Sequence, residues 1–310
     1  MYEVIDEHWN ILTDDTEIRI TKGYAMLSQK FMKYYSMLIY TTLVINVTPS
    51  LTPLLLDAVI PLNESRPRFF PVEVEFRVDK DKYFLPIWFY IFILGLVSSN
   101  VVAGVDSMHI VNAAHASSLF AIVSKQMENI ILKIDNNNGT RKNKYSMNEE
   151  LDSLSDKIIY REYVICLRKY QHAIKFVDAL NSSYQAYALI MLLLSIGIVN
   201  MIGIQLIYVT NQVRVLLKLA FLFMALLCTL MITCYSGQTI MDESQNVFHG
   251  AYAAEWYKFS PRLKSLLIIT LYRSKTPCEL KAGNMIPLSI ATYATVMRMS
   301  MSYYTTLLSI

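Results

Sequence analysis

The chain has 310 residues, of which 54% are hydrophobic and 17% charged, and its formal net charge is +3. Soluble globular domains usually carry about 25% charged residues. This composition therefore argues against an ordinary soluble domain and directs attention to the places where the apolar residues gather.

The apolar residues form long blocks that are almost free of charge. A hydrocarbon core of about 30 Å takes about 20 helical residues to cross, and each block is long enough. In lipid a segment must satisfy its own backbone hydrogen bonds, so each block is predicted to be a helix and not a strand. The predicted membrane-spanning helices cover residues 34–60, 83–105, 179–210, 215–240 and 284–310. The sequence thus predicts an all-α, polytopic membrane protein.

Residues 1–33 carry several acidic side chains and no early apolar run, so they are predicted to be a cytoplasmic segment and not a signal peptide. The loop 61–82, between the first two spans, balances acidic and basic residues and contains the glycosylation sequon at Asn63. We predict that this loop is extracellular and that Asn63 is glycosylated. Other sequons fall within a predicted span or on the predicted cytoplasmic side, so basic residues decide the orientation.

Lys and Arg residues mark the predicted cytoplasmic side, with ten of them between residues 114 and 178 and six between 241 and 283. The amino terminus is therefore predicted inside the cell and the carboxyl terminus outside. Segment 106–178 keeps apolar residues at helical intervals, which predicts that the second and third spans continue into the cytosol as helices. Region 241–283 mixes charge with an apolar run too short to cross, and is predicted to be a partly buried cytoplasmic anchor.

The sequence contains no evident catalytic or metal-binding pattern. The five histidines form no pair at i, i+4 with a nearby carboxylate, and the four cysteines match neither a disulfide framework nor a zinc site. Gly-rich phosphate loops, Gly-x-Ser-x-Gly and paired intramembrane carboxylates are also missing from the sequence. These absences disfavour an enzyme, and we expect no catalytic residue, no metal and no cofactor.

Two stretches within the spans leave alternatives open. The run "YFLPIWFYIF", residues 83–92, contains Tyr83, which we interpret as an interfacial anchor, and the deeper Trp88, which either lines an apolar cavity for a small volatile molecule or faces lipid. On the last span, Ser302, Thr306 and Ile310 share one face at i, i+4, i+8. This face either lines a narrow aqueous path with a hydrophobic constriction or packs through its small residues against other helices.

Three stretches carry a family resemblance: "YSGQ" at 235–238, "AYAAEWYKFSPRLK" at 251–264, and "YRSKTPCELKAGNMIPLSIATYATVMRMSMSYYTTLL" at 272–308. Their order closely resembles the carboxyl-terminal signature of insect odorant receptors, and the segments "HWNILTDDTE" and "PLNESRPRFFPVEVEFRVDKDKYF" resemble loops that flank the third span of those receptors. The resemblance covers essentially the whole chain. It implies that the five predicted spans correspond to the third through seventh helices of a seven-helix family, and that the first two are absent from this sequence.

The resemblance implies an odorant-binding subunit of a ligand-gated, non-selective cation channel in the plasma membrane of olfactory sensory neurons. The implied partners are a small volatile odorant, subunits of a shared olfactory co-receptor in a hetero-oligomer, taken as a tetramer, and the lipid bilayer, with no nucleic acid. Depth and facing, without a motif, select the expected odorant-binding residues, which are Phe84, Trp88, Phe92, Tyr208 and Phe221. Carried to matching positions, Ser302, Thr306 and Ile310 line the pore, and Glu255, Trp256, Tyr257 and Arg262 form the subunit anchor.

Two other functions remain open at the level of sequence. A G-protein-coupled chemoreceptor would need the opposite orientation, against the distribution of Lys and Arg, and glycosylation mapping of Asn63 against Asn138 separates the two. A non-conducting, truncated receptor fragment is the third possibility. Recording odorant-evoked current with the co-receptor distinguishes that fragment from a working subunit.

Overall fold

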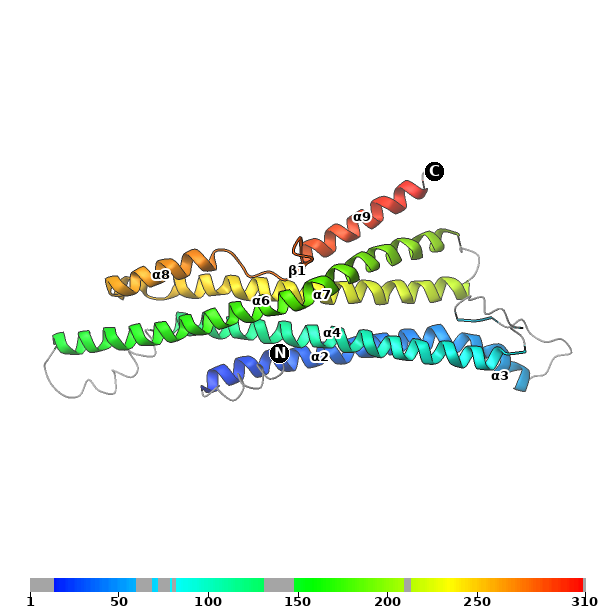
Figure 1. Cartoon of the computed structure of the whole chain (residues 1–310), viewed down its shortest axis with the longest axis horizontal. Coiled ribbons are helices and arrows are strands. Elements are labelled where there is room, and N and C mark those ends of the chain that lie inside the picture. The colour runs from blue at the N-terminus through cyan, green and yellow to red at the C-terminus, as the bar shows by residue number, and fades with distance from the viewer. Residues whose placement is uncertain are drawn as a thin grey trace. The chain divides into compact units, whose positions relative to one another are not determined.

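The computed structural model describes residues 14–59, 69–71, 79, 82–130, 148–208 and 213–308, and the structural statements below concern these residues. Helices dominate this part of the chain (Figure 1). They are α2 (Asp15–Val47), α3 (Thr52–Val59), α4 (Phe84–Glu128), α6 (Asn148–Tyr208), α7 (Val213–Ala253), α8 (Pro261–Ser274) and α9 (Ile290–Leu308), with 3-10 turns η1 (Thr48–Leu51) and η2 (Trp256–Lys258). The prediction of an all-α protein is confirmed.

Four helical stretches are long and apolar enough to cross a membrane. They are Asp15–Asp57, Phe84–Glu128, Asp156–Gln205 and Val215–Ala253. These stretches contain nearly all of the first four predicted spans. Helix α9, with 19 residues, is not in this set, since Arg298 and several hydroxyl side chains lower its apolar character. The fifth span, predicted at 284–310, therefore remains a prediction.

Two of the helices are much longer than a bilayer requires. Helix α4 has 45 residues and α6 has 61, which correspond to about 68 Å and about 92 Å at 1.5 Å per residue. Both run without a break from a predicted cytoplasmic segment into a predicted span, as the periodicity of segment 106–178 indicates. Helix α2 differs from the prediction of one helix to residue 60, because it ends at Val47. A 3-10 turn, Thr48–Leu51, follows it, and Pro49 in the first positions of this turn has no backbone N–H to donate.

The chain divides into two compact units. The first comprises the described residues of Met1–Gln29, His109–Leu193 and Ile232–Thr295, and the second those of Lys30–Met108, Leu194–Met231 and Val296–Ile310. The first unit holds most of the residues predicted to be cytoplasmic. The second holds most of the residues predicted to lie in the membrane.

The first unit has a dense core made by α4, α6, α7 and α8. The phenol of Tyr163 on α6 donates a hydrogen bond to Thr270 Oγ1 on α8 at 3.0 Å, and the rings of Phe120 and Tyr170 meet edge to face with centroids 6.1 Å apart. Gly250 on α7 allows close approach to α4, since a Cβ there would lie 2.5 Å from the carbonyl oxygen of Ser124. Aromatic contacts and a glycine notch thus fix these helices together.

A short hairpin in the first unit leads into α9. Strands β1 (Lys281–Ala282) and β2 (Ile286–Pro287) pair antiparallel around a tight turn in which Gly283 and Asn284 both have φ of 60°. Glycine and asparagine are the residues that adopt this left-handed conformation most readily. The backbone N–H of Gly283 donates to the carbonyl of Gln185 at 3.0 Å, which attaches the hairpin to α6.

Candidate functional site

Three of the residues predicted to bind odorant lie together on one face of α4 in the second unit. Phe84 is buried, and its ring lies 5.0 Å from that of Phe70 between centroids. One and two turns further on, the rings of Trp88 and Phe92 stack with centroids 5.5 Å apart and an interplanar angle of 4°. Trp88 Nε1 also donates to the carbonyl of Val47 at 3.4 Å. The spacing of four residues thus builds a continuous aromatic row beside the end of α2.

The other two residues of that prediction are placed differently. Phe221 lies on α7 and is 44% exposed, so it is much less enclosed than Phe84. Tyr208 is the last residue of α6, and its side chain lies outside the described residues. The aromatic row of Phe84, Trp88 and Phe92 is therefore the part of the predicted odorant site that the structure brings together.

Helix α9 has two distinct faces in the second unit. Val296 and Ser300 are buried, and Tyr304, on the same face at i+8, donates its hydroxyl to the backbone carbonyl of Val199 on α6. Ser302 and Thr306, predicted to line a pore, are exposed. Ile310, the third residue of that prediction, lies outside the described residues. The predicted pore face is thus separate from the face that α9 packs within its own chain.

The predicted subunit anchor forms the start of an exposed surface in the first unit. Trp256 and Tyr257 lie in η2 and are exposed, with ring centroids 6.4 Å apart, while Glu255 is half-buried and Arg262 is exposed on the first turn of α8. Further along α8 the surface becomes apolar. It adds Ile268, Ile269 and Tyr272, the last of which is 82% exposed. An apolar surface of this kind is typical of an association site.

The segment between α8 and β1, which contains Cys278, is attached to α7 by a hydrogen bond. The backbone N–H of Cys278 donates to Ser244 Oγ on α7 at 2.9 Å, and burial raises the pKa of the Cys278 thiol above its usual range. Cys278 is therefore a neutral packing residue, in agreement with a structural role.

The predicted glycosylation site, Asn63, lies outside the described residues.

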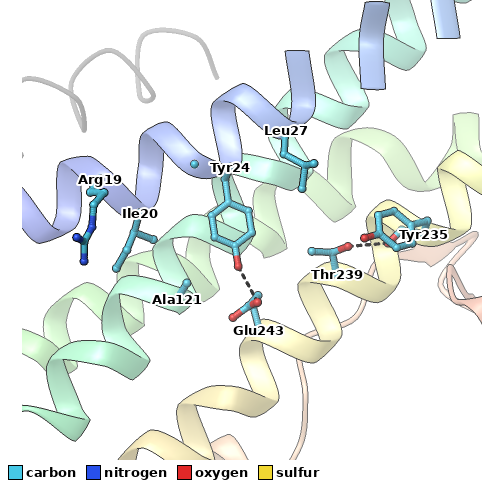
Figure 2. A pocket seen from close by; sticks show the side chains of 9 residues that line it. Arg19, Ile20, Tyr24, Leu27, Ala121, Tyr235, Thr239 and Glu243 are labelled. Atoms are coloured by element: carbon cyan, nitrogen blue, oxygen red, sulfur yellow. Dashed lines mark hydrogen bonds between the residues drawn. The ribbon is translucent and has the colours of Figure 1, made fainter. Parts of the chain in front are cut away.

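A groove that the sequence did not indicate lies in the first unit, where α2, α4 and α7 meet. Its volume is about 570 Å³, and its lining residues are Arg19, Ile20, Gly23, Tyr24, Leu27, Ala121, Tyr235, Thr239 and Glu243. Figure 2 shows Arg19 toward one end, Tyr235 toward the other, and the Tyr24 phenol pointing at Glu243 between them. Tyr24 donates to Glu243 Oε1 at 2.6 Å. No motif marks this groove, because its lining comes from three helices that are far apart in the chain.

A second polar contact lies in the second unit, near the inner ends of the predicted spans. The Tyr35 hydroxyl donates to Asp106 Oδ2, and both side chains are buried. A buried carboxylate needs such a donor, because desolvation without one is costly. Asp106 is therefore part of a helix-to-helix contact between α2 and α4.

Taken together, the long apolar helices define a polytopic helical membrane protein. The family model described as "7tm Odorant receptor" matches residues 2–301. The chain belongs to this family of odorant receptors.

Individual relatives agree with this assignment. The chain is 24% identical to "Odorant receptor 2a" of Drosophila melanogaster over 48% of this chain and 38% of that protein, and 23% identical to "Odorant receptor 10" of Aedes albopictus over 62% and 48%. The matches thus span less than half the length of these curated relatives.

The fold is also similar to that of a solved receptor. The olfactory receptor OR5 of Machilis hrabei, in complex with eugenol, superposes with a TM-score of 0.62 at 13% identity, over 93% of this chain and 70% of that chain. A second structure of the same receptor gives a TM-score of 0.57. At this identity the similarity establishes the fold, and it confirms the predicted odorant-receptor-like helical bundle.

Proposed function

We propose that this chain is the odorant-binding subunit of a ligand-gated, non-selective cation channel in the plasma membrane of olfactory sensory neurons. Family membership supports the receptor part of this proposal. The observation that carries the channel part is the division of α9 into a packed face with Val296 and Ser300 and an exposed face with Ser302 and Thr306.

The exposed face of α9 is chemically suited to water and unsuited to lipid. Thr306 satisfies one bond by donating to the carbonyl of Ser302 at 2.9 Å, yet hydroxyl oxygens keep further capacity to accept. Arg298 is exposed on the same helix. Burying such groups in hydrocarbon is costly, whereas a conduit shared with neighbouring subunits would hydrate them.

For the ligand we propose a small, mostly apolar volatile molecule that contacts Phe84, Trp88 and Phe92. An aromatic row provides a large apolar surface and few polar groups, so the shape of the site would set selectivity. The solved relative bound eugenol, a small aromatic molecule, which is consistent with this chemistry. Tyr208 and Phe221 remain predicted contributors.

For assembly we propose that the apolar surface of η2 and α8 contacts subunits of a shared co-receptor in a tetramer. Exposed Trp256, Tyr257 and Tyr272 provide the type of aromatic side chain that dominates association surfaces. In this arrangement the amino terminus lies inside the cell, the carboxyl terminus lies outside, and Asn63 lies on the extracellular side.

The test is a recording of odorant-evoked current from cells that express the chain with the co-receptor. Thr306→Cys should then make the current sensitive to a charged, water-soluble thiol reagent, whereas Ser300→Cys, at a position that is 3% exposed, should not. A current that the reagent leaves unchanged in Thr306→Cys would overturn the pore assignment. Surface-expressed wild-type chain that gives no current would instead favour the non-conducting fragment.

A further inference from the structure

Helix α9 is joined to α6 in the second unit by a contact that uses the backbone of α6. Tyr304 donates its hydroxyl to the carbonyl of Val199, which is 1% exposed. The same tyrosine side chain lies directly over Gly203, where an added Cβ would overlap two ring carbons and the hydroxyl oxygen. The phenol and the glycine therefore form one interlocked contact.

The position of the glycine explains why a helix carbonyl can receive this hydroxyl. In an α-helix the N–H of residue 203 bonds to the carbonyl of residue 199, so the side chain at 203 lies beside that carbonyl. Any side chain larger than hydrogen would cover it. Gly203 leaves the second lone pair of the Val199 carbonyl open, and the ring of Tyr304 fills the space.

The contact also fixes how α9 is rotated. Successive helical residues turn by about 100°, so Ser302 and Thr306, each two positions from Tyr304, lie about 160° around the helix from it. Holding Tyr304 against α6 therefore directs the hydroxyl face away from α6. Loss of the contact would leave the buried Ser300 and Val296 to hold this rotation by packing alone.

We propose that the contact between Gly203 and Tyr304 is a latch that sets which face of α9 borders the ion conduit, with Tyr304 as a positioning residue. This inference rests on the proposed channel function. It adds to that function a specific determinant of pore geometry, located on the partner helix and outside the pore face itself.

The first test compares two glycines of α6 in the channel formed with the co-receptor. Gly203→Ala should lower the odorant-evoked current, normalised to surface protein, by about tenfold or more, because the new methyl group displaces the ring. Gly197→Ala is the matched control, since no atom lies within 4 Å of a Cβ at that position, and its current should stay within about twofold of wild type. Equal effects of the two variants would overturn the latch.

A second pair removes only a hydroxyl and so avoids misfolding. Tyr304→Phe should lower the normalised current by about threefold, in line with the loss of one hydrogen bond, and should slow modification of Thr306→Cys by the charged thiol reagent. Tyr303→Phe, on the exposed neighbouring side chain, should change neither quantity. An unchanged modification rate in Tyr304→Phe would show that the contact does not set the rotation of α9.

If the Tyr304 ring and Gly203 form one contact, the effects of substituting them should not add. In a Tyr304→Ala background no ring remains to be displaced, so Gly203→Ala should cause no additional loss, and additive losses would contradict the latch. Geometry is tested apart from conduction by crosslinking Gly203→Cys to Tyr304→Cys with a short bifunctional thiol reagent in the membrane-embedded chain. Crosslinking without any wild-type current would retain the contact and reject the channel function, whereas current without crosslinking would reject the contact.

Discussion

Helix α4 contributes to both units, and its two parts differ in which side chains they expose and which they bury. In the second unit its apolar side chains are mostly exposed, among them Leu85, Phe89, Tyr90, Ile93, Leu94, Val97 and Val101. In the first unit its polar side chains are mostly buried, among them His109, Asn112, His115, Ser117 and Ser118. A water-soluble protein would instead expose its polar side chains and bury its apolar ones. The pattern of α4 is reasonable when hydrocarbon surrounds the second-unit part and protein surrounds the first-unit part.

Several of the buried polar side chains of α4 have hydrogen-bond partners, which makes their burial tolerable. Ser117 donates to the carbonyl of Ala113 at 2.9 Å, Ser118 donates to that of His115 at 2.7 Å, and His109 Nε2 shares a hydrogen bond with Ser236 Oγ at 2.8 Å. Such small side chains let neighbouring helices approach closely. Helix packing in the first unit thus includes small and polar residues beside apolar ones such as Phe120 and Met127, whereas the exposed apolar side chains of α4 in the second unit suit contact with lipid.

The largest predicted effect is the difference in the free energy of unfolding between alanine substitutions at two phenylalanines of α4. Phe120 in the first unit is 0% exposed and Phe89 in the second is 57% exposed. Phe120→Ala should lower the free energy of unfolding by about 3 to 5 kcal/mol, because it leaves a cavity in a packed core. Phe89→Ala should cost well under about 1 kcal/mol, since the ring faces the surroundings. Thermal unfolding of the detergent-solubilised protein measures both, and similar losses would show that the two parts of α4 do not differ in packing.

A smaller effect is expected where α7 meets α4. Gly250→Ala places a methyl group against the Ser124 carbonyl and should destabilise the first unit by about 1 to 3 kcal/mol. Gly104→Ala, in the second-unit part of α4, has no atom within 4 Å of the new Cβ and should be neutral or stabilising by up to about 1 kcal/mol. The same unfolding assay compares the two. A stabilising Gly250→Ala would mean that α4 and α7 are not in close contact there.

The sequence predicted the features that depend on local pattern. Uncharged blocks located the long helices, and the spacing of Phe84, Trp88 and Phe92 placed all three on one face. The break after Val47 was missed, although Pro49 is a local signal for it.

Contacts between distant segments could not be predicted in the same way. The groove between Tyr24 and Glu243 joins residues 219 positions apart, and the pairing of Gly203 with Tyr304 joins two helices whose proximity no single-sequence pattern reveals. Phe221 is predicted from depth and expected facing, and without a motif these do not fix which side of a helix meets a neighbour. Periodicity determines a face, but only the packed structure determines what that face meets.

The smallest predicted effect tests a single hydrogen bond in the first-unit core. Tyr163 on α6 is fully buried, donates to Thr270 on α8 and meets the ring of Phe259 at 6.2 Å between centroids. Tyr163→Phe keeps the ring and removes only the hydroxyl, so the free energy of unfolding should fall by about 1 kcal/mol. Tyr160→Phe, one turn earlier and exposed, should change it by less than about 0.5 kcal/mol.

The difference between these two tyrosines bears on the comparison of the units. In the first unit a buried hydroxyl requires a protein partner, because neither water nor lipid is available to it. A Tyr163→Phe protein as stable as wild type would mean that Thr270 finds another partner or that water reaches the contact, and the first unit would then be less tightly packed around α8 than its buried core indicates. A loss well above about 3 kcal/mol would instead mean that the hydroxyl positions α8 as a whole, which limited proteolysis of the exposed surface of α8 would detect as faster cleavage.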